Sequence, residues 1–408
     1  MRRLCLIVLL SAFVLFSAGA SLAGWVRQFE PLGENLYSVH FPENSQTGYM
    51  VGDGGLIEKT TNGGRDWTPQ VLYTVPGLRS VHFPVDASTG YAVGEVATIL
   101  KTTNGGTDWM FQDPGTFYYL YSVRFPADGQ TGYAVGMGGT ILKTTNGGAN
   151  WMVQTPGTTH TTHILWSVHF PVDPGRVEPQ TGYAVGDSGT ILKTANGGAT
   201  WVSQSSGTTL NLFSVHFPTN AQTGYTVGDS GAILKTTNGG TNWMVQASGM
   251  AQRHLSVHFP VNADTGFVVG FGGTIRTTTN GGATWTSQYS NTGNTLWSIH
   301  FPVDAWTGYI VGDGGTILKT TDGGVGVEEG RNAEFGMRNA ELRISPNPFT
   351  SFATLPGHER EAFALYDIAG RQVGTCKGDR IGEGLAPGVY FLKPEGQGTK
   401  PLRVVKVR

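Results

Sequence analysis

Short runs of alternating hydrophobic and polar residues recur along most of the chain. In LYSVHFP (36–42), Tyr37, Val39 and Phe41 fall on one face of an extended strand, and Ser38 and His40 fall on the other. Each unit continues with three further strand-like runs, such as TGYAVG, GTILKTT and NWMVQ, with turn residues between them. We name these strands A to D in chain order and expect an all-β fold.

An Asn-Gly-Gly turn joins strands C and D of each unit. Asn and Gly tolerate positive φ, and the Asn side chain is expected to bond its own backbone two residues further on. Successive turns are 42 residues apart, except for one interval of 50 whose extra residues fall in two loops, and their first residues are Asn62, Asn104, Asn146, Asn196, Asn238, Asn280 and Asp322. A period in the forties with four strands per unit predicts the blades of a β-propeller.

The N-terminal segment contains the strand D that the last repeat lacks. Six repeats open strand D with a tryptophan, at Trp67, Trp109, Trp151, Trp201, Trp243 and Trp285. The seventh repeat has Val327 at this position, whereas Trp25 in GWVRQ lies 42 residues before Trp67. We therefore predict a seven-bladed β-propeller over 24–324, closed by an N-terminal strand that completes the last blade.

The repeat resembles a known group of propellers. TTNGGTNW (236–243) has the spacing of an Asp-box, and TGYAVGDSGTILKTANGGATW (181–201) resembles the Ycf48/Hcf136-like photosystem-assembly propellers of the wider sialidase-like, BNR-repeat group. The resemblance covers about 24–324 and implies the propeller fold. It implies no particular activity, because Asp-boxes occur on propellers with many functions.

Residues 1–23 have the pattern of a secretory signal peptide. A short basic start precedes an apolar core (4–16), and small residues permit cleavage after Ala20 or Ala23. The apolar run is too short for a stable membrane span, and no other stretch is apolar enough to cross a bilayer. Because Cys5 is expected to leave with this peptide, Cys376 has no partner for an internal disulfide.

A polar linker (325–341) precedes a predicted small immunoglobulin-like β-sandwich over 342–408. Its strand-like runs are 342–349, 363–373, 385–393 and 402–408. Their order resembles the C-terminal sorting domain of the type IX secretion system; the matching residues are Pro346, Asn347, Pro348, Asp367, Gly370, Arg371, Gly388, Val389, Tyr390, Lys406 and Arg408. The resemblance implies passage through that secretion machinery and a secreted or outer-surface location. A generic immunoglobulin-like tail is the alternative.

Composition and charge narrow the possible partners. Charged residues make up 14% of the chain and Gly accounts for 61 of 408 residues, which suits a turn-rich β protein. The formal net charge is −2 without any basic block, and this argues against binding nucleic acid.

Two sets of residues recur in register near the expected channel. The B–C loops place a mostly acidic set at one position: Asp53, Glu95, Met137, Asp187, Asp229, Phe271 and Asp313. One interpretation of this set is a ring of carboxylates that binds a cation or performs glycosidic chemistry. The other is a turn residue that recurs because the turn recurs. Strand A carries His40, His82, Arg124, His169, His216, His258 and His300. Positions related by sevenfold symmetry do not converge on one metal ion, so we expect these side chains to hydrogen-bond between blades.

The face formed by the D–A and B–C loops is the predicted binding surface. Before each strand-A serine stands Tyr37, Arg79, Tyr121, Trp166, Phe213, Leu255 or Trp297, and these side chains either stack on a ligand or pack between blades. The D–A loops differ most among otherwise similar repeats, so the scaffold does not dictate their residues. The candidate ligand-binding residues are Tyr118, Tyr119, His160, His163, Trp166, Phe213, Arg253, His254 and Trp297.

No catalytic constellation is evident. The sequence has no nucleophile elbow, phosphate loop or Cys/His metal spacing, and the propeller's arginines do not share one repeat position as a sialidase site would require. We therefore predict a binding module without catalytic residues, cofactor or metal, which recognises an extracellular protein or glycan. Two alternatives remain: a glycoside hydrolase using a close pair of B–C carboxylates, and a structural surface protein without a specific ligand.

Overall fold

The chain forms two compact units, Met1–Glu329 and Gly330–Arg408. The computed structural model describes residues 24–28, 33–70, 75–154, 162–171, 180–324, 354, 362–366, 372–377, 379–386, 388–394 and 402–406. The predicted signal peptide, the linker and the first predicted strand of the tail lie outside these residues. No helix within the described ranges has both the length and the apolar character needed to cross a membrane.

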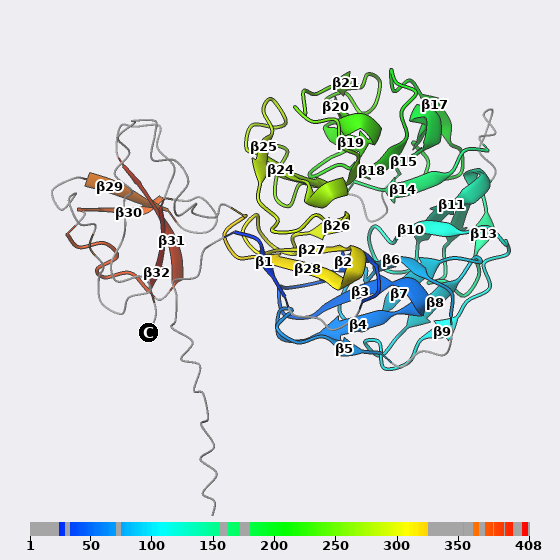
Figure 1. Cartoon of the computed structure of the whole chain (residues 1–408), viewed down its shortest axis with the longest axis horizontal. Coiled ribbons are helices and arrows are strands. Elements are labelled where there is room, and N and C mark those ends of the chain that lie inside the picture. The colour runs from blue at the N-terminus through cyan, green and yellow to red at the C-terminus, as the bar shows by residue number, and fades with distance from the viewer. Residues whose placement is uncertain are drawn as a thin grey trace, which may run out of the picture. The chain divides into compact units, whose positions relative to one another are not determined.

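Seven four-stranded antiparallel sheets form the ring of the first unit (Figure 1). From blade 1 to blade 7, strand A is β2 (Leu36–His40), β6 (Leu78–His82), β10 (Leu120–Arg124), β14 (Leu165–His169), β18 (Leu212–His216), β22 (His254–His258) and β26 (Leu296–His300). Strand B is β3 (Gly48–Gly52), β7 (Gly90–Gly94), β11 (Gly132–Gly136), β15 (Gly182–Gly186), β19 (Gly224–Gly228), β23 (Gly266–Gly270) and β27 (Gly308–Gly312).

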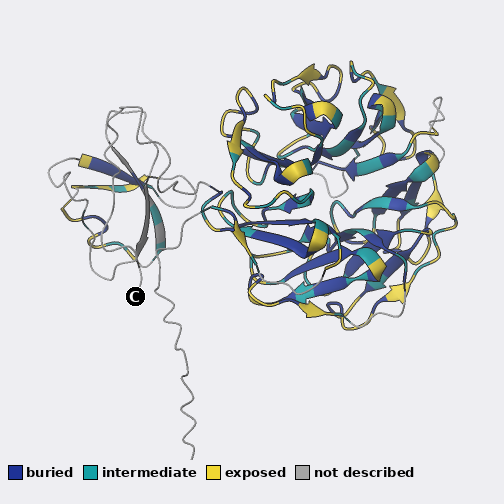
Figure 2. Cartoon of the chain, viewed as in Figure 1, coloured by how far each residue is buried: buried dark blue, intermediate teal, exposed yellow. Residues whose placement is uncertain are grey.

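The outer half of each blade is a longer strand C and a short strand D. Strand C is β4 (Ile57–Thr60), β8 (Ile99–Thr102), β12 (Ile141–Thr144), β16 (Ile191–Thr194), β20 (Ile233–Thr236), β24 (Ile275–Thr278) and β28 (Thr316–Thr320). Strand D is β5 (Thr68–Pro69), β9 (Met110–Phe111), β13 (Met152–Val153), β17 (Val202–Gln204), β21 (Met244–Val245), β25 (Thr286–Gln288) and, in blade 7, β1 (Val26–Arg27). Burial follows this order, because inner strands are mostly buried and outer strands exposed (Figure 2).

The predicted closure of the ring by the N-terminus is confirmed. Strand β1 pairs antiparallel with β28, with Val26 opposite Lys319 and Arg27 opposite Leu318. The Trp25 side chain is only 3% exposed, and its Nε1 donates to Oε1 of Gln288 at 2.8 Å. Residues from the two ends of the propeller thus form one blade, as the position of Trp25 predicts.

The Asp-box turn of blade 7 makes the expected bond two residues on, from the backbone N of Gly324 to Oδ1 of Asp322 at 3.0 Å. The turns of the other blades are held differently. In blade 1, Oδ1 of Asn62 accepts from the backbone N of Asp66, four residues further on rather than two. Oγ1 of Thr60 accepts from the backbone N of Asn62 and of Gly64. In blade 7 the backbone N of Gly24, from the N-terminal segment, also donates to Oδ1 of Asp322 at 3.2 Å.

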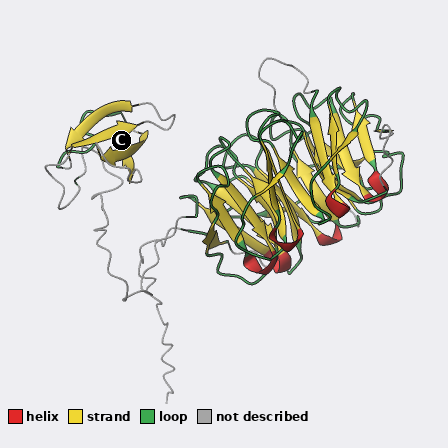
Figure 3. Cartoon of the chain, turned by 90° about the horizontal axis from the view of Figure 1, so that it is seen from above, coloured by secondary structure: helices red, strands yellow, loops and turns green. Residues whose placement is uncertain are grey.

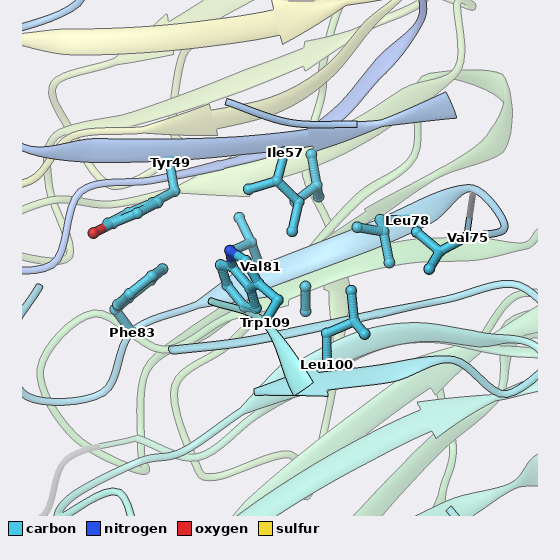
Figure 4. Packing of buried hydrophobic residues seen from close by; sticks show 10 residues of the cluster. Tyr49, Ile57, Val75, Leu78, Val81, Phe83, Leu100 and Trp109 are labelled. Carbon is cyan, nitrogen blue, oxygen red and sulfur yellow. The ribbon is translucent and has the colours of Figure 1, made fainter. Parts of the chain in front are cut away.

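A hydrophobic cluster fills the space between neighbouring blades. Figure 4 shows the cluster between blades 1 and 2, in which Tyr49 stacks on Phe83 at 3.8 Å between ring centroids and Trp109 meets the same Phe83 edge-on. The same Tyr-Phe stack recurs between other blades, with Phe267 replacing the tyrosine of blade 6. Burial of these rings against one another is the main force that holds the ring of blades together.

Strand A does not keep the strict alternation that its sequence indicates. In blade 1 the pairing with strand B shifts between Leu36 and Ser38, as in a β-bulge. Leu36, Val39 and Phe41 therefore belong to the buried cluster, whereas Tyr37 does not. The expectation that Tyr37 shares the core face with Val39 and Phe41 is wrong, because the bulge adds a residue between the two core positions.

Polar contacts also join each Asp-box turn to the preceding blade. Tyr49 and Lys59 of blade 1 both donate to the carbonyl oxygen of Gly105 in blade 2, at 3.0 and 2.7 Å. Blade 6 has Phe267 and Thr277 at these two positions, so it lacks both donors. At that junction Gln288 donates instead, from Nε2 to the carbonyl oxygen of Gly323 at 2.8 Å.

The second unit contains an antiparallel sheet in the order β30-β29-β31-β32. Its strands are β29 (Ala362–Tyr366), β30 (Gln372–Lys377), β31 (Gly388–Pro394) and β32 (Leu402–Lys406), so three of the four predicted strand regions contain strands. Phe363, Leu365, Ile381 and Leu392 form its core, with the free thiol of Cys376 packed against them. A small β unit is confirmed; the predicted strand region 342–349 lies outside the described residues, and the sandwich arrangement stays a prediction.

Candidate functional site

The D–A and B–C loops form one face of the propeller. In six blades the B–C turn is a short 3-10 helix, namely η1 (Asp53–Gly55), η2 (Met137–Gly139), η3 (Asp187–Gly189), η4 (Asp229–Gly231), η5 (Phe271–Gly273) and η6 (Asp313–Gly315), and Figure 3 shows these helices along one side of the ring. The first residue of the turn donates its backbone N–H to the end of the D–A loop, as Asp229 does to the carbonyl oxygen of Asn211 at 2.9 Å. The two loop sets are therefore held together in each blade.

The carboxylates of the B–C turns are occupied by neighbouring side chains. Trp166 and Trp297 donate from Nε1 to Asp187 and Asp313, at 2.7 and 2.6 Å. Tyr37 donates to Asp53 at 2.8 Å. Two further carboxylates bind arginines, in the pairs Arg79–Glu95 and Arg253–Asp229. The acidic set is thus more than a repeated turn residue, because each carboxylate orients a side chain on this face.

These side chains contact one another in a contiguous set, which we name the mouth ring. Most of its members directly precede the strand-A serines, which face the central channel. Its members are Tyr37, Arg79, Tyr121, Trp166, Phe213, Arg253, Phe271 and Trp297. Tyr37 meets Trp297 edge-on at 5.4 Å, and Trp166 contacts both Tyr121 and Phe213, at 4.4 and 5.6 Å. The interpretation of the aromatic residues as inter-blade packing is confirmed, while their half-buried state leaves part of each ring accessible.

The two arginines of the mouth ring lie against its aromatic side chains. The guanidinium of Arg79 lies 3.9 Å from the centroid of the Tyr37 ring, and that of Arg253 lies over Phe213 and Phe271 at 5.2 and 4.8 Å. Burial, and next the hydrogen bond to Asp53, raises the pKa of Tyr37, so its phenol stays a donor at neutral pH. The face therefore combines apolar rings, fixed donors and two paired cations.

Four of the D–A loop residues named from the sequence divide into three groups. Tyr118 is 54% exposed beside Gly138 of η2, and its neighbour Phe117, which we had not singled out, is 93% exposed. His163 is exposed and hydrogen-bonds through Nδ1 to Oγ1 of Thr190 at 2.9 Å. His160 lies outside the described residues. The carbonyl oxygen of Tyr119 accepts from Met137, so this residue supports the B–C turn.

His254 does not belong to the binding surface. It is the first residue of β22, where the other six blades have a buried leucine, and its side chain is completely buried. Burial lowers the pKa of His254 to about 4, with a smaller contribution from the positive charge of Arg276. When the repeats are aligned on the strand-A serine, His254 occupies the position of Leu36 and Leu212. This alignment predicts from the sequence alone that His254 is buried.

The expected inter-blade hydrogen bonds of the strand-A histidines are confirmed. Nε2 of His40 bonds to the carbonyl oxygen of Phe83 in the next blade at 3.1 Å, and His169, His216, His258 and His300 do the same. Nδ1 of His82 accepts from the backbone N of Phe125. Arg124 departs from the expectation, because its Nε is buried without a hydrogen-bond partner among the described residues. Nowhere in these ranges do three His, Cys, Asp or Glu side chains group as a metal ion would require.

The histidine ring predicts that the propeller loses stability in mild acid. Burial lowers the pKa of His169 to about 3 and that of His300 to about 4, against about 6.5 in an unfolded chain. Between those values the unfolded chain binds more protons, so stability is complete above about pH 6.5 and falls as the pH drops. Urea unfolding at pH 7.0, 6.0 and 5.0 should show a slope of at least about 1.4 kcal/mol per pH unit.

A non-titrating donor at one position provides the control. His169→Gln is expected to reduce that slope, because glutamine keeps a donor for the carbonyl oxygen of Phe217 without binding a proton. A stability profile that is flat between pH 7 and 5 would contradict the assignment of neutral, buried histidines.

The matches to known proteins lie in the propeller part of the chain. The family model described as Photosynthesis system II assembly factor YCF48 matches residues 19–113, 72–155, 159–246 and 204–292. YCF48 from Cyanidioschyzon merolae is 21% identical with a TM-score of 0.60, over 73% of this chain and 98% of that chain. A structure titled YCF48 bound to D1 peptide is 20% identical with a TM-score of 0.60, over 73% and 97%. No curated protein matches the chain. The solved structures share the propeller fold, and because the matched stretches cover more than half of its length, the chain belongs to the Photosynthesis system II assembly factor YCF48 family.

Proposed function

We propose that the propeller binds an extended segment of a partner protein on its D–A and B–C face. The mouth ring carries this proposal. Its tryptophans and tyrosines offer large rigid apolar surfaces, which lose little conformational entropy on binding, and its arginines offer directed donors. The related propeller bound to the D1 peptide supports the choice of a protein ligand, since that protein binds a peptide on the same fold.

The engagement of the carboxylates favours binding over hydrolysis. Glycoside hydrolysis needs one carboxyl group that gives up a proton and a second that acts as base or nucleophile. Here Asp187 and Asp313 accept from indole N–H groups, and Glu95 and Asp229 bind arginines. These carboxylates act as supports that orient the mouth ring, which is the role that a binding face requires.

Substitution of one mouth-ring tryptophan tests this function. The full-length chain is first screened on peptide and glycan arrays, and the affinity for the best ligand is measured by calorimetry. Trp297→Ala should weaken the binding of a peptide at least about 30-fold, as loss of a central aromatic contact does. Trp306→Ala is the matched control, because this partly exposed tryptophan of the same blade lies in its A–B turn, away from the mouth ring. Equal affinity of the two variants, or binding of glycans alone, would refute the proposal.

We also propose that the protein is exported, and that 342–408 directs its release or surface attachment. The leader-like residues 1–23 and the sorting-type motifs of the tail support this location. Cells that possess a type IX system are expected to place the full-length chain outside the outer membrane, and to retain a variant ending at residue 329 in the periplasm. Fractionation and N-terminal mass spectrometry measure both, and equal export of the truncated chain would contradict the role of the tail.

A further inference from the structure

The central channel contains a cavity that is lined by many hydrogen-bonding side chains. The cavity has a volume of about 150 Å³ and is lined by serine, valine or isoleucine, and histidine or arginine from strand A of the blades. This is roughly ten times the volume that one water molecule needs by the same measure. No acidic side chain lines it.

The serines of the cavity present hydroxyl protons to the channel. Oγ of Ser38 accepts from the backbone N of Val81 in the next blade at 3.3 Å, and the contact recurs around the ring. Because each oxygen accepts from the backbone, its proton remains available to donate. Six of these hydroxyls line the cavity, and no hydrogen bond donated by them occurs among the described residues; they belong to Ser38, Ser80, Ser122, Ser167, Ser214 and Ser298.

Arg124 adds a full positive charge to this ring of donors. It occupies the strand-A position that carries histidine in the six other blades, and its Nε is buried without a hydrogen-bond partner. The neighbouring histidines are held neutral by burial, so they do not compensate the charge. Arg124 is half-buried, and no acidic side chain lines the cavity beside it, so an anion is the ligand that compensates its charge.

We propose that the channel binds a small inorganic anion, held by the Arg124 guanidinium and by the serine hydroxyls. The guanidinium supplies the charge and directed N–H donors, and the hydroxyls supply a ring of weaker donors. Phosphate, sulfate and halide ions share this chemistry. The bound anion neutralises the charge of Arg124 and connects strand A of several blades.

Anion titration of the full-length chain tests the proposal. Thermal unfolding is followed in sodium phosphate, sulfate, chloride and bromide at constant ionic strength, with gluconate as the balancing ion. Stabilisation by at least one of the four ions should rise and then saturate with its concentration, as for a ligand that binds only the folded state. Calorimetry with the same sodium salt gives the affinity directly, and the four salts distinguish a site for oxyanions from one for halides.

Arg124→His is the matched variant, because it gives blade 3 the residue that the other six blades carry. It should bind the anion at least tenfold more weakly while unfolding at the same or a higher temperature in gluconate. Arg124→Lys should keep part of the binding. Crystals of the unaltered protein grown in bromide give a readout that does not depend on any variant, as an anomalous peak beside Arg124. No saturable stabilisation, or an equal effect in Arg124→His, would overturn the proposal, as would bromide crystals without that peak if chloride and bromide are the stabilising ions.

Discussion

Replacing Trp25 with alanine is expected to lower the free energy of unfolding by about 3–5 kcal/mol, the usual effect of removing a buried aromatic side chain. Trp25 is 3% exposed, meets Phe301 edge-on at 5.9 Å between ring centroids, and bonds to Gln288 at 2.8 Å. Strand β1 contributes only two residues to its sheet, so the buried side chain of Trp25 is a main part of its attachment, beside the backbone hydrogen bonds of Gly24 and Gln28. Its loss should release the N-terminal strand and open the last blade.

Urea unfolding monitored by circular dichroism measures this effect on the full-length chain. Val26→Ala is the control, because Val26 belongs to the same strand but is 48% exposed and should change stability by less than about 0.5 kcal/mol. Hydrogen exchange adds a local readout, since the amides of β28 should lose protection in Trp25→Ala. Equal unfolding midpoints for the two variants would show that the N-terminal strand does not close the ring.

Gly228→Ala is expected to destabilise the propeller by more than about 3 kcal/mol and to displace the face that we propose for binding. A Cβ atom at Gly228 would lie 2.0 Å from the carbonyl oxygen of Asn211, which is backbone and has no room to move aside. That oxygen also accepts the backbone N–H of Asp229, the carboxylate partner of Arg253. The clash therefore separates strands A and B and breaks the contact that holds the B–C turn, with the cost of an overpacked core site or more.

Gly293→Ala distinguishes this effect from a general intolerance of alanine in the loops. Gly293 lies in the D–A loop of blade 7, and a Cβ there would meet nothing within 4 Å. Its replacement should leave the melting temperature unchanged or slightly raised, because alanine restricts the unfolded chain. A Gly228→Ala protein that melts like the parent and keeps its ligand affinity would contradict the steric role of this glycine. The same close approach occurs at Gly52, Gly94, Gly136, Gly186, Gly270 and Gly312.

The repeat pattern is readable from the sequence because its determinants are local. The turn chemistry, the alternation of strands B and C and the 42-residue period act within one blade, so they predict the blade and the number of blades. The position of Trp25 predicts the closing strand, since a missing tryptophan at one end matches an extra one at the other. The inter-blade bonds of His40 and its equivalents were also predictable, because seven related positions around one axis have only their neighbours to contact.

The mouth ring was predictable only in part. The sequence assigns Trp166 and Asp187 to two different recurring positions of the repeat. It does not show that the indole donates to the carboxylate, because this contact depends on the angle between strand A and the B–C turn. His254 was misplaced because the boundary between the D–A loop and strand A is not visible in a single repeat. The β-bulge after Leu36 has no local signal, since the next blade determines which residues are buried.

The sequence by itself therefore determined the fold class, the blade count and the strand that closes the ring, through interactions between residues within one repeat or at equivalent positions of different repeats. Apart from the strand-A histidines, the tertiary structure alone decided which polar side chains meet across blades. Tyr49 and Lys59 share the Gly105 oxygen of the following blade, and Arg124 stands unpaired among neutral histidines. Such contacts join residues more than 40 positions apart, and their geometry is set by the packing of whole blades against one another.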